Sequence, residues 1–198
     1  MPGEAPRLVG VERTFRQAGA VLEGHFLLTS GRHSSVYWEK MRVLQHPGLT
    51  ARLCRPIARH FRERAVAVVV GPTTGGVVLA FEVARQLGVR AAYAEREGEG
   101  RAIRAGQLLT PGERVLVLDD ILTTGGSLGQ VVEAVGRAGG EVVGVAVIVD
   151  RRPADSLPLT IEGLPVFASH RSPTASYAPE ECPLCRAGVP VERLGGKR

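Results

Sequence analysis

The sequence predicts an α/β fold in which a central, mainly parallel sheet is flanked by helices. Three apolar runs, at residues 65–70, 115–118 and 142–149, are short and rich in valine, which is typical of strands buried on both faces. Segments with helical periodicity, at residues 76–87 and 127–138, follow the first two runs. Strands that alternate with short helices in this way form a parallel sheet with helices on its faces.

The size and composition of the chain fit one folded domain with small appendages at its ends. The 198 residues are 44% apolar and 23% charged, which excludes a disordered chain. The formal charge of +5 attracts anions, either nucleic acids or phosphorylated metabolites. Because the arginines are scattered and no basic stripe is interleaved with aromatic residues, the pattern favours metabolites over nucleic acid.

The cysteine content and the hydrophobic pattern bear on the compartment. The three cysteines form no disulfide framework, so a reducing cytoplasm is expected. The first ten residues lack a basic region followed by an apolar run, and no apolar run is long enough for a membrane helix. We therefore expect neither a signal peptide nor a membrane span.

The N-terminal third of the chain predicts a helix, two strands and a second helix. Residues 1–8 contain two prolines and a glycine and are expected to form a loose leader. Apolar spacing predicts a helix over residues 9–20, and residues 21–45 are typical of a strand, a turn and a second strand. Residues 47–64 return to helical spacing, and Pro56 is expected to kink or interrupt that helix.

The remainder of the chain adds one strand and a long irregular end. Residues 89–94 predict a strand after the helix at 76–87. After Arg151, seven prolines indicate loops and an extended tail, with residues 195–198 frayed. We expect three parts: N-terminal helix and strand elements at 1–45, a core at 46–170 and a C-terminal tail at 171–198.

Polar residues gather where the predicted strands end. Gly71 to Gly76 follows the first apolar run, Asp119 and Asp120 follow the second, and Asp150 and Arg151 close the third. Parallel sheets bind their ligands at the carboxyl ends of the strands. The sequence therefore predicts one site built from these three segments.

The segment at residues 115–127 has the properties of a phosphate cradle beside an acidic pair. Its glycines let the backbone curl so that several N–H groups converge, and the helix that follows adds the positive end of its dipole. Asp119 and Asp120 would repel a phosphate, so they suit the 2′- and 3′-hydroxyls of a ribose 5-phosphate, with Mg²⁺ beside them. Two alternatives are an ordinary helix cap and a Walker loop, but the latter needs a lysine where Leu128 stands.

This segment resembles the phosphoribosyl pyrophosphate (PRPP) signature of the type I phosphoribosyltransferases. Three other stretches resemble the orotate phosphoribosyltransferase family in particular: residues 24–34 with Tyr37, residues 70–76, and residues 177–190. The resemblance implies the type I phosphoribosyltransferase fold with a small N-terminal hood, in a homodimer. It also implies transfer of a 5-phosphoribosyl group from PRPP to orotate, in pyrimidine biosynthesis, with Mg²⁺ bound through PRPP.

The resemblance assigns roles to individual residues. Arg96 and Asp120 would be catalytic. PRPP would be held by two loops and one basic residue, namely Thr73, Thr74, Gly75, Arg96, Asp119, Asp120, Ile121, Leu122, Thr123, Thr124, Gly125, Gly126 and Ser127. Orotate would contact Tyr37, Trp38, Thr123 and Arg151, although Arg151 has the alternative of a salt bridge with Asp150.

The chain departs from the family pattern at two loops. Gly75 stands where many members have a lysine, and the loop at residues 95–101 is short and lacks the usual histidine. Arg96 is the best replacement for the missing lysine, with Arg101 and Arg104 behind it; the alternative is that these arginines lie in a solvated loop. The shortened loop leaves open an inactive member of the family. The central motif alone leaves open a phosphoribosyltransferase for a purine or another base, and the basic charge of the chain permits a PRPP-sensing regulator.

The remaining cysteines and histidines have no assigned catalytic role. Cys182 and Cys185 have the spacing of half a zinc site, and His170 is a candidate third ligand without a clear fourth. The alternatives are packing or pairing across a dimer. His25 and His33 fall in the hood and are expected to be structural or exposed.

Overall fold

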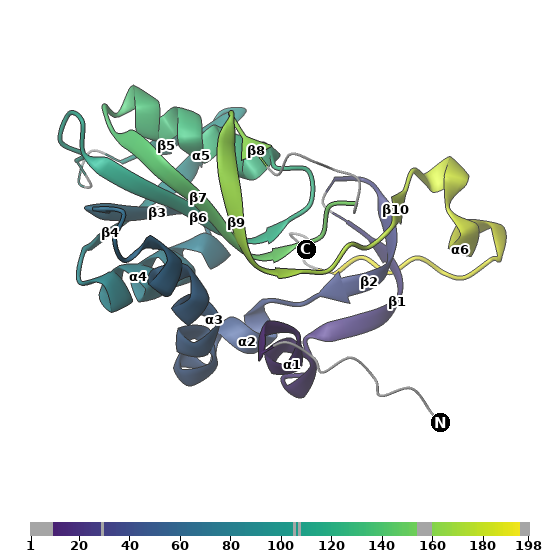
Figure 1. Cartoon of the computed structure of the whole chain (residues 1–198). Coiled ribbons are helices and arrows are strands. Elements are labelled where there is room, and N and C mark those ends of the chain that lie inside the picture. Colours follow the sequence, from purple (N-terminus) through teal and green to yellow (C-terminus); the bar gives the residue numbers. More distant parts are fainter. Residues whose placement is uncertain (1–9, 29, 105, 107, 154–159, 195–198) are drawn as a thin grey trace.

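The computed structural model describes residues 10–28, 30–104, 106, 108–153 and 160–194. The predicted leader at 1–8 and the end of the tail at 195–198 lie outside these residues. Two sheets are present, one of seven strands and one of three (Figure 1). The prediction of an α/β fold with a mainly parallel sheet is confirmed.

The seven-stranded sheet forms the centre of the molecule. Its strand order is β5-β4-β3-β6-β7-β9-β8, and only the two short edge strands, β5 and β8, run antiparallel to their neighbours. The strands are β3 (Val68–Pro72), β4 (Arg90–Glu97), β5 (Gly100–Ile103), β6 (Arg114–Leu122), β7 (Glu141–Asp150), β8 (Thr160–Ile161) and β9 (Leu164–Arg171).

Helices bury both faces of this sheet. Helices α3 (Pro47–Phe61) and α4 (Gly75–Leu87) cover one face, and α5 (Gly126–Arg137) covers the other (Figure 1). Side chains alternate between the two faces along each central strand, as the pleat requires. Val69, Leu116 and Ile148 pack with α3 and α4, whereas Val68, Val117 and Val147 pack with α5.

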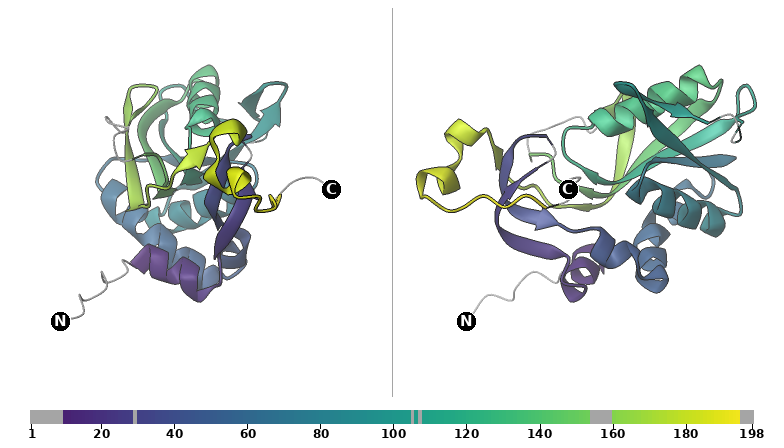
Figure 2. Two further views of the ribbon diagram at one scale, coloured as in Figure 1. Left: turned by 90° about the vertical axis from the view of Figure 1, so that its right-hand side faces the viewer. Right: turned by 180° about the vertical axis from the view of Figure 1, so that it is seen from behind.

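The hood is a second layer at one end of the large sheet. It contains α1 (Gly10–Gln17), β1 (Val21–Leu27), β2 (His33–Trp38) and the short helix α2 (Met41–Leu44). The C-terminal tail returns to it, because β10 (Ser176–Tyr177) pairs with β2, and η2 (Pro179–Glu181) and α6 (Pro183–Arg186) lie beyond (Figure 2). The predicted helix and strand pair are confirmed; α2 was not predicted.

Three predictions about local structure were wrong. Helix α3 runs through Pro56 without interruption, because Leu53 and Ile57 on either side are packed in the core. The irregular region after Arg151 contains β9; Pro165 is tolerated there because the ladder with β7 begins only at Val166.

The third error concerns the loop at residues 95–101. These residues form the β4–β5 hairpin, in which Arg96 pairs with Arg101 and Glu97 with Gly100.

Among the described residues, no helix is long and apolar enough to cross a bilayer.

Candidate functional site

A polar cavity of about 410 Å³ lies at the carboxyl ends of β3 and β6. Both predicted loops and the acidic pair open into it, together with residues from the hood and from the β4–β5 hairpin. The lining residues are Ser30, Lys40, Pro72, Thr73, Thr74, Gly75, Arg96, Arg101, Asp119, Asp120, Ile121, Leu122, Thr123, Thr124, Gly125, Ser127 and Leu128. Every residue predicted to bind PRPP lines the cavity, except Gly126.

The two carboxylates are fixed in place by the strand that carries them. Strand β6 continues through Asp119 and Asp120, which are 9% and 5% exposed. The backbone N–H of Asp120 donates to Asp119 Oδ1 at 2.8 Å, and the N–H of Ile121 donates to Asp120 Oδ1 at 2.7 Å. Lys40 Nζ lies 2.7 Å from Asp120 Oδ2. The acidic pair is therefore rigid before any ligand arrives.

The acidic pair is held at an energetic cost. Burial, and next the charge of Asp120, raise the pKa of Asp119 to about 7. Burial disfavours the charged form of Lys40, but the charge and hydrogen bond of Asp120 outweigh this effect and raise the pKa of Lys40. Buried groups with perturbed pKa values that face one cavity are typical of functional sites.

We expect Asp119→Asn to stabilise the ligand-free protein at alkaline pH. The pKa of Asp119 is higher in the folded than in the unfolded chain, so wild-type stability falls as pH rises from about 4 to about 7, and the full penalty is present above that range. The asparagine does not ionise, so the variant escapes this penalty. Urea unfolding at pH 5 and pH 8 measures the effect: the gain should be larger at pH 8. An equal difference at both pH values would contradict this account.

Two helices begin at the cavity wall without side-chain caps. Helix α4 starts at Gly75 after Thr74, helix α5 starts at Gly126 after Gly125, and neither cap position makes a side-chain hydrogen bond. The free N–H groups and the dipole of each helix favour an anion. The cavity thus has two positions that favour an anion, and the acidic pair lines the same cavity.

The glycines at these helix starts are required by the geometry. Gly125 has a φ of +91°, and a Cβ there would lie 2.4 Å from Ile161 Cδ1. A Cβ on Gly75 would lie 2.2 Å from Asp120 Oδ2 and 3.4 Å from Lys40 Cδ. Lys40 therefore places its side chain beside the position where many members of the family have a lysine.

The β4–β5 hairpin contributes two arginines, of which one is buried and hydrogen-bonded and the other is exposed. Arg101 is 8% exposed and donates to Thr73 Oγ1 at 3.4 Å and to Ser127 Oγ at 3.3 Å, so it connects the two loops. Arg96 faces Arg101 across the hairpin, is exposed and lines the cavity. Arg104 forms an ion pair with Glu95 and is not among the cavity-lining residues, so its predicted supporting role is not borne out by its position.

Arg151 is a buried guanidinium that faces the hood. Its Nη2 donates to Ser34 Oγ and to the Val36 carbonyl oxygen, both at 3.0 Å. The alternative salt bridge with Asp150 is absent, because Asp150 pairs with Arg152 at 3.1 Å. Burial lowers the pKa of Arg151, and no described carboxylate forms an ion pair with it. A buried guanidinium without a carboxylate partner favours the binding of an anionic ligand.

The two aromatic residues predicted to contact the base have different positions. Tyr37 is half-buried, and burial and then the charge of Glu39 raise its pKa, with Asp120 and Arg151 also close enough to act on it. Trp38 is 4% exposed and packs edge-on against Phe15, with a ring-centroid distance of 4.8 Å. Trp38 therefore belongs to the hydrophobic core and is not among the residues that line the cavity, so its burial opposes the predicted contact with the base.

Sequence reasoning missed Lys40 and Ser30 and ranked Arg101 below Arg96. Lys40 lies between β2 and α2, away from every motif, and only the fold brings it to the cavity. For Arg101, residues 95–101 are all charged or glycine, so no alternation of apolar and polar residues marked the two strands of the hairpin. The acidic pair also provides oxygen ligands of the type that Mg²⁺ prefers, so the site fits this ion.

Comparisons with known proteins agree with this geometry. The model of the phosphoribosyl transferase domain matches residues 41–161. An orotate phosphoribosyltransferase of Pelotomaculum thermopropionicum is 46% identical over 185 residues, which cover 93% of this chain and 95% of the relative. A second orotate phosphoribosyltransferase, from Chlorobium phaeobacteroides, is 45% identical over 183 residues, which cover 92% of this chain and 93% of the relative.

Solved structures show the same architecture. The crystal structure of orotate phosphoribosyltransferase from Aeropyrum pernix has a TM-score of 0.70 and 28% identity, over 81% of this chain and 93% of that one. An adenine phosphoribosyltransferase from Rhodothermus marinus has a TM-score of 0.65 at 23% identity, over 82% of this chain and 98% of that one, which shows a common fold.

Proposed function

The chain belongs to the orotate phosphoribosyltransferase family, and from this premise we propose that it transfers the 5-phosphoribosyl group of PRPP to orotate, giving orotidine 5′-phosphate and pyrophosphate. The observation that carries the proposal is the pair of buried carboxylates that shares one cavity with two uncapped helix N-termini. PRPP has the matching pattern, with a phosphate at one end, a pyrophosphate at the other and a ribose between them.

Each part of the cavity has a role in holding the donor. The N-terminus of α5 and the hydroxyls of Thr123, Thr124 and Ser127 bind the 5′-phosphate. The N-terminus of α4 receives the pyrophosphate. Asp119 and Asp120 accept hydrogen bonds from the ribose hydroxyls, because like charge excludes them from either phosphate site.

Catalysis is mainly electrostatic. The bond from C1′ to pyrophosphate breaks ahead of the bond to the base, which leaves positive charge on the sugar and negative charge on the leaving group. Asp120 lies near the first charge, whereas Lys40, Arg96 and Arg101 balance the second. Arg101 is already fixed by Thr73 and Ser127, so little reorganisation is needed when the charge develops.

We further propose that PRPP enters with Mg²⁺. When bound, the ion neutralises charge on the pyrophosphate oxygens and so helps the leaving group depart. Asp119 and Asp120 are the carboxylates that line the cavity and would hold the ion, and Lys40, 2.7 Å from Asp120, would limit the net negative charge around them.

Orotate is the acceptor that Arg151 favours. Its carboxylate would supply the counter-charge that Arg151 lacks within the described structure. Tyr37 is close enough to Arg151 for their charges to interact. Thr123 lines the cavity, whereas Tyr37 and Arg151 are not among its lining residues. A purine base carries no carboxylate and would leave the buried guanidinium unpaired.

We also propose an oligomeric state, a cellular location and a pathway for the enzyme. We expect a homodimer in the cytoplasm that works in pyrimidine biosynthesis. An apolar depression on α4 and β4, with Val77 and the 65%-exposed Phe81 in its lining, is a suitable contact surface. Light scattering of the purified protein tests the oligomeric state, and a monomer at micromolar concentration would refute this part.

The reaction itself is tested with Mg²⁺ and PRPP against a panel of bases. Loss of orotate absorbance with equimolar release of pyrophosphate is the expected result, and adenine, hypoxanthine and uracil should remain unconverted. Turnover of a purine without turnover of orotate would overturn the assignment. Tight PRPP binding with no turnover of any base would instead indicate a sensor.

The two hairpin arginines should differ in effect. We expect Arg96→Ala to lower kcat by about tenfold with the PRPP KM little changed, because Arg96 is exposed and completes the charge balance only around the leaving group. Arg101→Ala should raise the PRPP KM as well, because it disconnects Thr73 from Ser127. Steady-state kinetics with varied PRPP separates the two, and identical changes in both variants would count against this division.

A further inference from the structure

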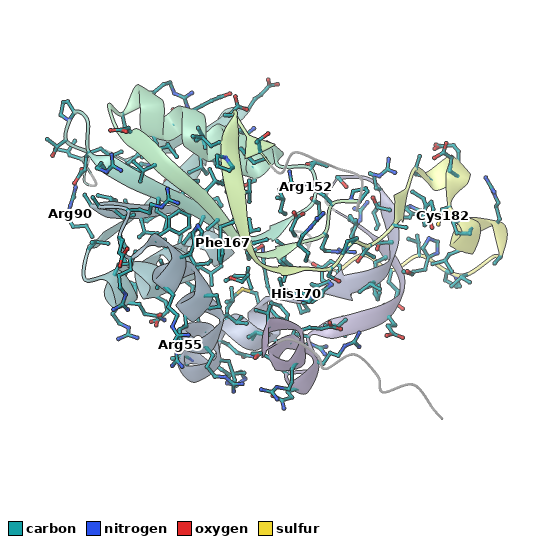
Figure 3. The ribbon with its side chains drawn as sticks, viewed as in Figure 1. Arg55, Arg90, Arg152, Phe167, His170 and Cys182 are labelled. Atoms are coloured by element: carbon teal, nitrogen blue, oxygen red, sulfur yellow. The ribbon has the colours of Figure 1, made fainter. Side chains whose placement is uncertain are left out.

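Four metal-binding side chains meet at the far end of the hood. They are His25 on β1, His33 on β2, and Cys182 and Cys185 of the tail, called here the His/Cys cluster. One ligand atom from each residue lies within 4.8 Å of all the others. Figure 3 shows Cys182 in the tail, well away from the large sheet. The cluster is separate from the PRPP cavity, none of whose lining residues belong to it.

The distances within the cluster fit a tetrahedral metal site. His25 Nε2 lies 2.9 Å from His33 Nδ1, 3.4 Å from Cys182 Sγ and 3.7 Å from Cys185 Sγ, and His33 Nδ1 lies 3.2 Å from Cys185 Sγ. Zinc bonds of about 2.0–2.3 Å place neighbouring tetrahedral ligand atoms about 3.3–3.8 Å apart. The four distances above lie within about 0.5 Å of this spacing, and the remaining two are no longer than 4.8 Å.

Hydrogen bonding alone does not account for the arrangement. The Nδ1–H of His25 donates to the Val189 carbonyl oxygen at 2.7 Å, so the neutral ring has one lone pair left, on Nε2. Three possible donors lie close to that single lone pair. A cation at the centre uses the lone pairs of all four atoms at once. A backbone carbonyl that orients a ligating histidine is a common feature of zinc sites.

Burial and charge indicate a closed, structural site. His25, His33 and Cys182 are 2%, 7% and 0% exposed, whereas Cys185 is exposed at the surface. Two thiolates and two neutral imidazoles balance the charge of one Zn²⁺, and sulfur with imidazole nitrogen selects zinc over magnesium. Four protein ligands leave no open position for a substrate.

We propose that the chain binds one Zn²⁺ through His25, His33, Cys182 and Cys185, and that this ion fastens the C-terminal tail to the hood. The backbone supports the same connection, because the Glu192 N–H donates to the His25 carbonyl oxygen at 2.7 Å. His170, the candidate third ligand for the two cysteines, is not part of the cluster. His170 lies on β9, where its Nε2 is 3.6 Å from Glu12 Oε2, and Figure 3 shows His170 far from Cys182.

Metal analysis of the untagged protein tests the proposal. After expression with zinc and purification without chelator, mass spectrometry should find one zinc per chain. Cys182→Ser and Cys185→Ser should each lower the zinc content by more than about tenfold. Cys54→Ala is the matched control, because Cys54 is buried between α3 and α4 and should leave the zinc content unchanged.

Spectroscopy identifies the ligands without any substitution. X-ray absorption at the zinc edge should fit two sulfur atoms at about 2.3 Å and two nitrogen atoms at about 2.0–2.1 Å. Cobalt-substituted wild-type protein should show the visible bands of a tetrahedral ion with a thiolate charge-transfer band. This measurement keeps the proposal testable if a cysteine variant fails to fold.

The stabilising role has its own readout. A chelator should lower the thermal unfolding midpoint of the wild type and of Cys54→Ala, and should have no effect on Cys185→Ser. Three outcomes overturn the proposal: no zinc bound after reconstitution under reducing conditions, equal zinc content in wild type and both serine variants, or a Cys182–Cys185 disulfide in place of the metal.

Discussion

Replacing Arg151 with alanine should lower kcat/KM for orotate by about 10³-fold while leaving the KM for PRPP nearly unchanged. The guanidinium is 6% exposed and anchored by Ser34 and Val36, so a carboxylate that reaches it forms a desolvated, charge-assisted contact. Arg151→Lys should recover only a small part of the loss, because an ammonium cannot form two parallel hydrogen bonds to a carboxylate. Steady-state kinetics with orotate varied at saturating PRPP measures kcat/KM for orotate in each variant.

A matched control separates recognition of the base from general damage. Arg16→Ala removes an exposed arginine whose partner is Glu12 on the same helix, outside both the cavity lining and the proposed dimer surface, and should keep orotate kinetics within about twofold of the wild type. If Arg151→Ala lowered PRPP and orotate efficiency equally, its role would be structural. Unaltered orotate kinetics in Arg151→Ala would show that the carboxylate binds elsewhere.

Asp120→Asn should lower kcat by about 10²–10³-fold. The carboxylate is fixed by the Ile121 N–H at 2.7 Å, and the substitution removes its charge while keeping its shape. The developing positive charge on the ribose then loses its nearest counter-charge. The KM for PRPP should change far less than kcat, because Lys40 is released from its ion pair and becomes free to meet the pyrophosphate.

The control for this variant is another carboxylate held by an ion pair. Glu113→Gln breaks the contact with Arg90 at 2.6 Å on the surface and should leave kcat unaltered. Urea unfolding of both variants confirms that the proteins are folded. Wild-type turnover by Asp120→Asn would exclude Asp120 from the reaction.

Periodicity and turn residues predicted the central fold well, because buried parallel strands leave a simple signal. The runs at 115–118 and 142–149 correspond to β6 and β7, and Gly88 ends α4 in the left-handed conformation expected of a helix cap. Strand β9 was missed because its pattern is mixed: Val166 is buried, whereas Phe167 and His170 are only partly covered. Side-chain packing, rather than local preference, makes this segment a strand.

The site was predictable only as far as its motifs extend. The PRPP loop carries its own signature, so its position in the cavity follows from the fold. Lys40 has no motif, and its ion pair with Asp120 joins residues 80 positions apart. The His/Cys cluster is a more extreme case, since His25 and Cys182 are separated by 157 positions. No local pattern selects His25 over His170 as the partner of Cys182.

The return of the tail to the hood affects the order in which the protein is completed. Strand β2 gains its second neighbour from β10, and β1 is bridged by Glu192; both segments are synthesised after every strand of the central sheet. Until then, β2 has an open edge beside Ser34, the residue that steadies Arg151. A polypeptide that stops before residue 176 can thus form its central sheet and still lack the strand that covers β2 beside Ser34, so orotate binding depends on residues that are made after the sheet.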